Sequence, residues 1–191
     1  MRGDCVISSV TCLNSQPFTV MGQRVFDKAD YYIRRGNRKR LRHLIGKHRY
    51  LLRSDEALLV FSAIWHNTAM LPWLLDRGVH PDSRLGEHGN TPLMQAAANG
   101  DVSTMRQLLD HGADPNARNE VSETPLGFAC AWNQWQAAEL LIDHGAEVNA
   151  IENDGNTYLD WVTIGEHTEG IELLQARGAR KFADLAQTSG T

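Results

Sequence analysis

Histidines and cysteines are the residues of this 191-residue chain that could bind a metal or act in catalysis. Of the eight histidines, His111 and His144 occupy equivalent positions in two similar segments, so they could stack above one another in a repetitive fold. A zinc site needs three or four converging ligands, however, and both histidines directly precede a glycine, at a position that only has to be polar. We therefore expect these histidines to be structural or solvent-exposed, with no metal and no cofactor.

The sequence shows no motif that pairs a nucleophile with a base. A glycine-rich phosphate loop, His-Glu-x-x-His, Cys-x-x-Cys and a serine elbow are all missing from it. The chain has an odd number of cysteines, namely Cys5, Cys12 and Cys130, and their spacing is not that of a metal site. This argues against a disulfide framework and favours a reducing compartment. The first twenty residues lack the continuous apolar centre of a secretory signal, and no stretch is apolar for long enough to cross a membrane. We predict a cytoplasmic protein that is not an enzyme.

Charge is distributed unequally along the chain. Residues 1–53 contain 12 Lys or Arg against 3 Asp or Glu, a net charge of +9, whereas residues 54–191 contain 7 against 20, a net charge of −13. The two values give the net charge of −4 for the whole chain. A basic end joined to an acidic body bears on the choice of partners rather than on the fold.

Three short phrases recur at a constant spacing, which is the period of the sequence. They are Thr91-Pro92-Leu93, Thr124-Pro125-Leu126 and Thr157-Tyr158-Leu159, and each precedes a phrase that runs from leucine to glycine and ends at Gly112, Gly145 or Gly178. A weaker copy of the second phrase ends at Gly78, at nearly the same distance from its successor. Such a period is typical of repeat architectures, in which each unit buries its apolar surface against its neighbours.

Each unit can be interpreted as two short helices. Thr91 is placed to cap the first helix, and Pro92 suits its first position, where the missing N–H is not needed. Asp101 opens the second helix, and Gly112 ends it with the positive φ that glycine tolerates. One such pair cannot bury both of its apolar faces, so we expect the pairs to stack.

Pro72 predicts a bend or a late start in the second helix of the weaker copy.

These phrases resemble the ankyrin repeat family, most clearly over residues 89–118 and 122–151. Met94, Gly127 and Asp160 stand where the family's Thr-Pro-Leu-His opening has histidine, and Tyr158 replaces the proline. The resemblance implies an all-α ankyrin repeat solenoid of about five stacked helix-turn-helix units with capping units at both ends. We expect a flexible N-terminal extension (1–26), an N-terminal capping helix pair (27–53), a degenerate repeat (54–84), two full repeats (85–118 and 119–151) and a C-terminal capping repeat (152–187).

The resemblance also implies protein recognition on the concave side, which the loop tips and the exposed side of the first helices form. The residues that map to this side are Trp65, His66, Glu87, His88, Asn90, Asn99, Glu120, Val121, Glu123, Trp132, Asn133, Asn153, Asp154 and Asn156. Trp65 and Trp132 have two interpretations: they anchor a partner, or they lie flat and fill space between repeats. Acidic residues at the tips (Glu87, Glu120, Glu123, Glu152 and Asp154) favour a partner with a basic surface, and the alternative is that they only keep the protein soluble.

Several roles remain open for such a protein. Some small bacterial ankyrin proteins are immunity factors that occlude a cationic toxin, so an inhibitor or immunity-type protein is the leading hypothesis, with an adaptor or scaffold as the alternative. We expect the free protein to be a monomer that does not bind membranes. The basic residues between 34 and 49 suggest binding to nucleic acid, as a third hypothesis, or to a membrane surface. No aromatic stacking module or base-reading motif accompanies them in the sequence, so a solvated capping surface is the preferred interpretation.

Overall fold

A computed structural model describes residues 20–48, 60, 64, 67–152 and 155–188. It divides into two compact units, residues 1–89 and 90–191, which are described separately below. Within the described residues the regular structure is helical apart from isolated bridges, which agrees with the predicted all-α repeat fold. No helix among those residues is both long and apolar enough to cross a membrane.

The first unit contains the helix pair α2 (Val20–Arg34) and α3 (Arg38–Lys47). Side chains at an i, i+4, i+8 spacing on α2 (Val25, Ala29 and Ile33) are buried together with Phe26 of α2 and with Leu41 and Ile45 of α3. Gly36 (φ 61°) forms the turn between the helices, and the side chain of Asn37 accepts a hydrogen bond from the Arg40 N–H. Helix α2 begins at Val20, inside the segment predicted as an extension, and its described buried side chains Val25 and Phe26 also lie before residue 27.

A short 3₁₀ helix, η2 (Thr68–Met70), leads directly into α5 (Leu71–Leu75) in the same unit. Pro72 lies in the first turn of α5, which confirms the late helix start. Two contacts tie this segment to the first pair, since the Asn67 amide donates to the Ile33 carbonyl (3.1 Å) and Arg38 donates to the Ala69 carbonyl (3.1 Å). The first helix predicted for residues 54–84 falls largely outside the described residues, so the number of five units stays a prediction.

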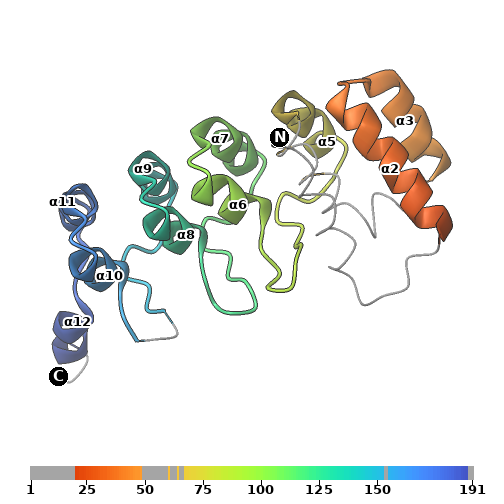
Figure 1. The fold of residues 1–191 in the computed structure, drawn as a ribbon. Coiled ribbons are helices and arrows are strands. Elements are labelled where there is room, and N and C mark those ends of the chain that lie inside the picture. The colour runs from red at the N-terminus through yellow and green to blue at the C-terminus, as the bar shows by residue number, and fades with distance from the viewer. Residues whose placement is uncertain (1–19, 49–59, 61–63, 65–66, 153–154, 189–191) are drawn as a thin grey trace, which may run out of the picture. The chain divides into compact units, whose positions relative to one another are not determined.

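The second unit contains three successive helix pairs that lie side by side in chain order (Figure 1). They are α6 (Pro92–Ala98) with α7 (Val102–Asp110), α8 (Pro125–Ala131) with α9 (Trp135–Asp143), and α10 (Tyr158–Ile164) with α11 (Thr168–Ala176). First helices contact first helices, and second helices contact second helices. A further helix, α12 (Phe182–Thr188), follows the last pair and was not predicted.

Threonine caps start all three first helices of this unit, as predicted. The hydroxyl oxygens of Thr91, Thr124 and Thr157 accept hydrogen bonds from the backbone N–H three residues later, at 3.3, 3.1 and 3.4 Å. Asp101 caps α7 in the same way through the Thr104 N–H (3.0 Å), and Gly112 follows that helix with a φ of 84°. The stacked pairs bury small and larger apolar side chains, among them Leu93, Ala96, Met105, Leu108, Leu126, Ala129, Leu141 and Leu159.

Candidate protein-binding face

Most of the exposed large apolar side chains described in the second unit lie on one part of the repeat, and the exception is Phe182 (42% exposed) at the start of α12. Trp132 (63% exposed) and Ile164 (76%) lie at the ends of the first helices α8 and α10, whereas Val121 and Ile151 lie in the loops that precede these two helices. Among the described residues, no large apolar side chain of α7, α9 or α11 is exposed to this degree. We call the exposed side of α6, α8 and α10, together with the described residues of the loops before α8 and α10, the first-helix face. Apolar groups gathered on one surface are typical of a binding site.

Trp132 is positioned by a bend that recurs in each helix pair of this unit. Its N–H donates to the Phe128 carbonyl (3.2 Å) at the end of α8, and Asn133 follows with a φ of 56°. Gly100 and Glu166 adopt the same left-handed conformation in the other two pairs, with φ of 66° and 56°. The backbone at Trp132 is thus set by the repeat, while its side chain projects into solvent. Asn99, the equivalent residue of the first pair, is also exposed.

The loop before α8 is organised by Asn119, which sequence reasoning missed. The side-chain oxygen of Asn119 accepts hydrogen bonds from the N–H groups of Val121 (3.1 Å) and Glu123 (2.8 Å). Its amide nitrogen donates to Asn90 (2.7 Å) and to the Glu123 carboxylate (2.9 Å). Asn119 itself is only 5% exposed. This one buried side chain therefore holds Glu120 and Val121 outward at the tip of the loop.

The predicted contact residues differ in how the structure uses them. Glu120 and Val121 are exposed at the tip, whereas Asn90 and Glu123 are half-buried in the hydrogen bonds of Asn119. Asn156 is half-buried too, and its carbonyl accepts from the Glu152 N–H (3.0 Å). Glu87 and His88 are exposed and belong to the other unit. Trp65, His66, Asn153 and Asp154 lie outside the described residues.

Glu152 does not form part of an exposed acidic tip, so that expectation is wrong. Its side chain is buried, and it accepts a hydrogen bond from the Tyr158 hydroxyl (2.7 Å). The Tyr158 oxygen also lies 2.6 Å from the Thr124 hydroxyl of the preceding repeat. Because Tyr158 donates its single hydrogen to Glu152, Thr124 donates to Tyr158. Tyr158 stands in place of the family's proline, and its hydroxyl gives the carboxylate a buried partner.

Burial raises the pKa of Tyr158 in this cluster and the pKa of the nearby Cys130 thiol. Desolvation raises the pKa of Tyr158, and the nearby Glu152 carboxylate adds to the shift, although the Thr124 hydrogen bond opposes it. Desolvation, with a smaller contribution from Glu152, also raises the pKa of the Cys130 thiol to about 12. Cys130 is therefore a neutral buried thiol at neutral pH, with no thiolate available for nucleophilic chemistry.

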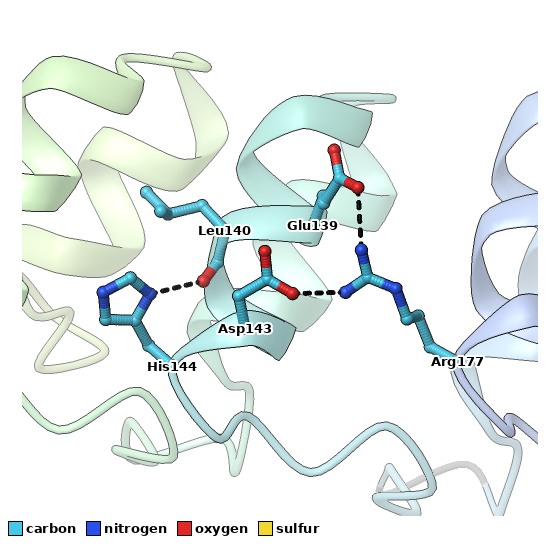
Figure 2. Close-up of polar contacts among 5 residues, drawn as sticks. All are labelled: Glu139, Leu140, Asp143, His144 and Arg177. Atoms are coloured by element: carbon cyan, nitrogen blue, oxygen red, sulfur yellow. Dashed lines mark hydrogen bonds and ion pairs between the residues drawn. The ribbon is translucent and has the colours of Figure 1, made fainter.

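Polar contacts dominate the side formed by the second helices. Arg177, which directly follows α11, donates to Glu139 (2.7 Å) and to Asp143 (2.6 Å) of α9 (Figure 2). The Nδ1 atom of His144 lies 2.8 Å from the Leu140 carbonyl, and that of His111 lies 2.7 Å from the Gln107 carbonyl. Both histidines thus have a structural role at helix ends. The described residues contain no group of three or more side chains placed to hold a metal.

The match to known proteins agrees with this geometry. A family model described as ankyrin repeats (3 copies) matches residues 31–119 and 94–184. A search of curated proteins finds no significant match. The two matched ranges cover most of the chain, including every helix from α6 to α11. The chain therefore belongs to the ankyrin repeat family, whose repeats are generally protein–protein interaction modules.

Proposed function

We propose that this protein is a non-catalytic recognition module that binds a partner protein on its first-helix face. The observation that carries the proposal is the exposure of Trp132 and Ile164 on consecutive repeats whose second helices expose no comparable side chain among the described residues. Stacked first helices lie about 10 Å apart, so the two side chains can fill neighbouring pockets of one partner. Tryptophan in particular is enriched at the centres of protein interfaces.

Hydrogen bonds within the protein hold the backbone of this face at Trp132 and at the tip of the loop before α8. Trp132 follows a helix end, and the loop at Glu120 and Val121 is held by the hydrogen bonds of Asn119. A surface that is already ordered loses little conformational entropy on binding, so a modest number of contacts supports a specific complex. This supports Trp132 as an anchor for a partner rather than as a residue that fills space between repeats.

The charge near the loop tip favours a partner with a basic surface. Glu120 is exposed there, and residues 54–191 as a whole carry a net charge of −13. Complementary charge chiefly accelerates association, and salt weakens that contribution. Replacement of Glu120 by lysine is therefore expected to slow association by a larger factor at low salt than at high salt, which kinetic binding measurements would show.

The more specific proposal is that binding inhibits the partner, as an immunity-type protein inhibits a toxin. An acidic, preformed surface suits the occlusion of a cationic protein, and this supports the inhibitor over the adaptor or scaffold. The activity of the partner distinguishes the two roles. An inhibitor abolishes that activity at stoichiometric concentration, whereas a scaffold leaves it intact and brings a third component to the complex.

The site is tested by affinity capture with matched double variants of the full chain. Trp132→Ser with Ile164→Ser removes both anchors, and Gln136→Ser with Gln175→Ser makes similar changes at exposed positions of α9 and α11. The partner is expected on the wild-type protein and the α9/α11 variant but not on the anchor variant. Equal recovery of the same partner on all three proteins would refute the proposed site. Circular dichroism checks that each variant is folded.

A further inference from the structure

The first unit carries a charged surface that the proposed function does not use. Helix α2 buries Val25, Phe26, Ala29 and Ile33 on one side. Its opposite side presents residues at an i, i+4, i+7, i+11 spacing, namely Arg24, Lys28, Tyr31 and Arg35, and all four are exposed. Residues at this spacing line up along a helix. We call these four residues the α2 stripe.

An aromatic ring lies within this row of cations. Tyr31 is 50% exposed, and the Arg35 guanidinium lies over its ring, 5.4 Å from the centroid. The ring of Tyr32 meets Tyr31 edge-on, with centroids 5.7 Å apart and an interplanar angle of 64°. Neighbours on two sides therefore restrict how the Tyr31 ring can turn. An exposed ring beside an arginine offers a flat surface for a nucleobase and a cation for the adjoining phosphate.

Of the two acidic residues of α2, Asp30 lies on the flank of the helix, whereas Asp27 borders the stripe. Asp30 pairs with Arg34, one turn further along the helix, at 2.7 Å. Asp27 lies three residues after Arg24 and four residues before Tyr31, so it is next to both on the helix surface. The charged residues of the stripe itself, in contrast, are all cations.

The start of α3 continues the positive charge immediately after Arg35. Its first three residues are Arg38, Lys39 and Arg40, all exposed, and its first turn contains no acidic residue. The N-terminus of a helix carries a partial positive charge, so three cations there oppose the helix dipole. Arg38 donates to the Ala69 carbonyl and thus helps to hold the fold. Helix stability gives no reason for Lys39 and Arg40, whereas a bound anion would balance their charge.

We propose that the α2 stripe and the first turn of α3 bind single-stranded nucleic acid. In this arrangement Arg24, Lys28 and Arg35 contact successive phosphates, and Tyr31 stacks on an unpaired base. Neither contact reads the edge of a base, so binding tolerates many sequences. The exposed Tyr31, which the sequence did not identify as a stacking residue, is the observation that distinguishes this surface from a solvated cap.

The packing of the two helices favours nucleic acid over an anionic membrane. A helix that lies in a membrane surface inserts an apolar face among the lipids. The apolar side chains Val25, Ile33 and Leu41 are instead buried in the core of the unit. Arginine, which predominates here, also pairs its planar donors with phosphate oxygens better than lysine does.

The test measures binding of the full chain to a fluorescent single-stranded oligonucleotide of about 12 nucleotides by anisotropy. If three phosphates are neutralised, affinity falls about 20-fold between 50 and 200 mM salt. Tyr31→Leu is expected to weaken binding about tenfold, whereas Tyr31→Phe retains the ring and the affinity. Lys28→Gln with Arg35→Gln is expected to lower both the affinity and the salt dependence. Arg106→Gln with Lys181→Gln removes two exposed cations of the other unit and leaves binding unchanged.

Three results would overturn the proposal. The first is equal affinity of the Tyr31→Leu and Tyr31→Phe proteins, since stacking would then play no part. The second is an equal loss for the two double variants, which would indicate unspecific charge attraction. The third is binding to phosphatidylserine vesicles or polyglutamate that is as tight as binding to the oligonucleotide. Thermal unfolding monitored by circular dichroism checks that the variants retain the fold.

Discussion

Single buried polar side chains set the shape of the loops in this protein. Asn119 and Glu152 occupy equivalent positions in successive repeats, and both are buried at the base of a loop that precedes a first helix. Asn119 binds within its own loop and to Asn90, whereas Glu152 accepts from Tyr158. The period predicted that the two positions are equivalent but not that both are buried. Burial depends on side-chain partners, which are Asn90 in the preceding repeat for Asn119 and Tyr158 for Glu152, and local spacing does not reveal them.

Replacement of Asn119 by alanine is expected to destabilise the protein by about 2 kcal/mol, because several buried backbone and side-chain groups lose their partner together. Asn99→Ala, at an exposed position at the end of α6, is the matched control and is expected to change the free energy of unfolding by less than about 0.5 kcal/mol. Urea denaturation measures both values. A loss no larger for Asn119→Ala than for the control would show that this residue does not organise the loop.

At the scale of helices, the sequence predicted the starts of the capped first helices better than it predicted α2 and α12. Threonine caps and a proline at the first position are local signals, and the structure has them at Thr91 and Thr124. The start of α2 at Val20 and the presence of α12 were missed, because neither carries such a signal. The first-helix face was predicted from the same period, but which of its residues are exposed depends on packing between repeats.

Helix α12 is connected to α10 through one carboxylate. Asp160 accepts hydrogen bonds from the N–H groups of Thr157 (3.0 Å) and Phe182 (2.9 Å). Slight burial of the Asp160 carboxyl group favours its neutral form and raises its pKa. The hydrogen bonds from Phe182 and Thr157 act in the opposite direction, as does the charge of Lys181. Together they outweigh burial, so the pKa of Asp160 lies below its ordinary value.

The Asp160 carboxylate is therefore expected to stabilise the start of α12 at neutral pH, and this contribution is lost as the pH falls through the lowered pKa. Amide exchange at Phe182, followed by NMR, is expected to show less protection as the pH falls below the ordinary carboxyl pKa of 3.8, once the intrinsic pH dependence is removed. Asp160→Asn serves as the control, since it cannot titrate. The same acid-induced loss in that variant would contradict the role of Asp160.

The contact of Arg177 with α9 is a second link between elements. Its side chain is 27% exposed, and its two partners, Glu139 and Asp143, are 51% and 56% exposed. Pairs this accessible contribute little, so Arg177→Gln is expected to cost about 0.5–1 kcal/mol, and less in high salt. Arg106→Gln on α7 is the matched control. Thermal unfolding at low and high salt measures the difference, and a cost that does not change with salt would contradict an electrostatic contribution.

At the scale of the whole molecule, positive charge is concentrated near the N-terminus and negative charge in the rest of the chain. We infer two binding surfaces of different chemistry: the α2 stripe with the first turn of α3, and the first-helix face of the second unit. The sequence predicted the charge asymmetry and the repeat. It did not predict the exposed ring of Tyr31, because the side of α2 that is left exposed depends on how α2 packs against α3. The proposed protein partner and the proposed nucleic acid therefore use surfaces that can be altered independently.

Photo-crosslinking of the partner from defined positions tests the central claim most directly. A photoreactive amino acid is placed at Trp132 or Ile164 of the first-helix face, or at Arg106 or Glu172 on α7 and α11, and each protein is irradiated in the presence of its captured partner. All four positions are exposed in the free protein. We predict crosslinks from positions 132 and 164 and none from 106 and 172. Crosslinks from 106 and 172 alone would place the partner on the second helices and contradict the account.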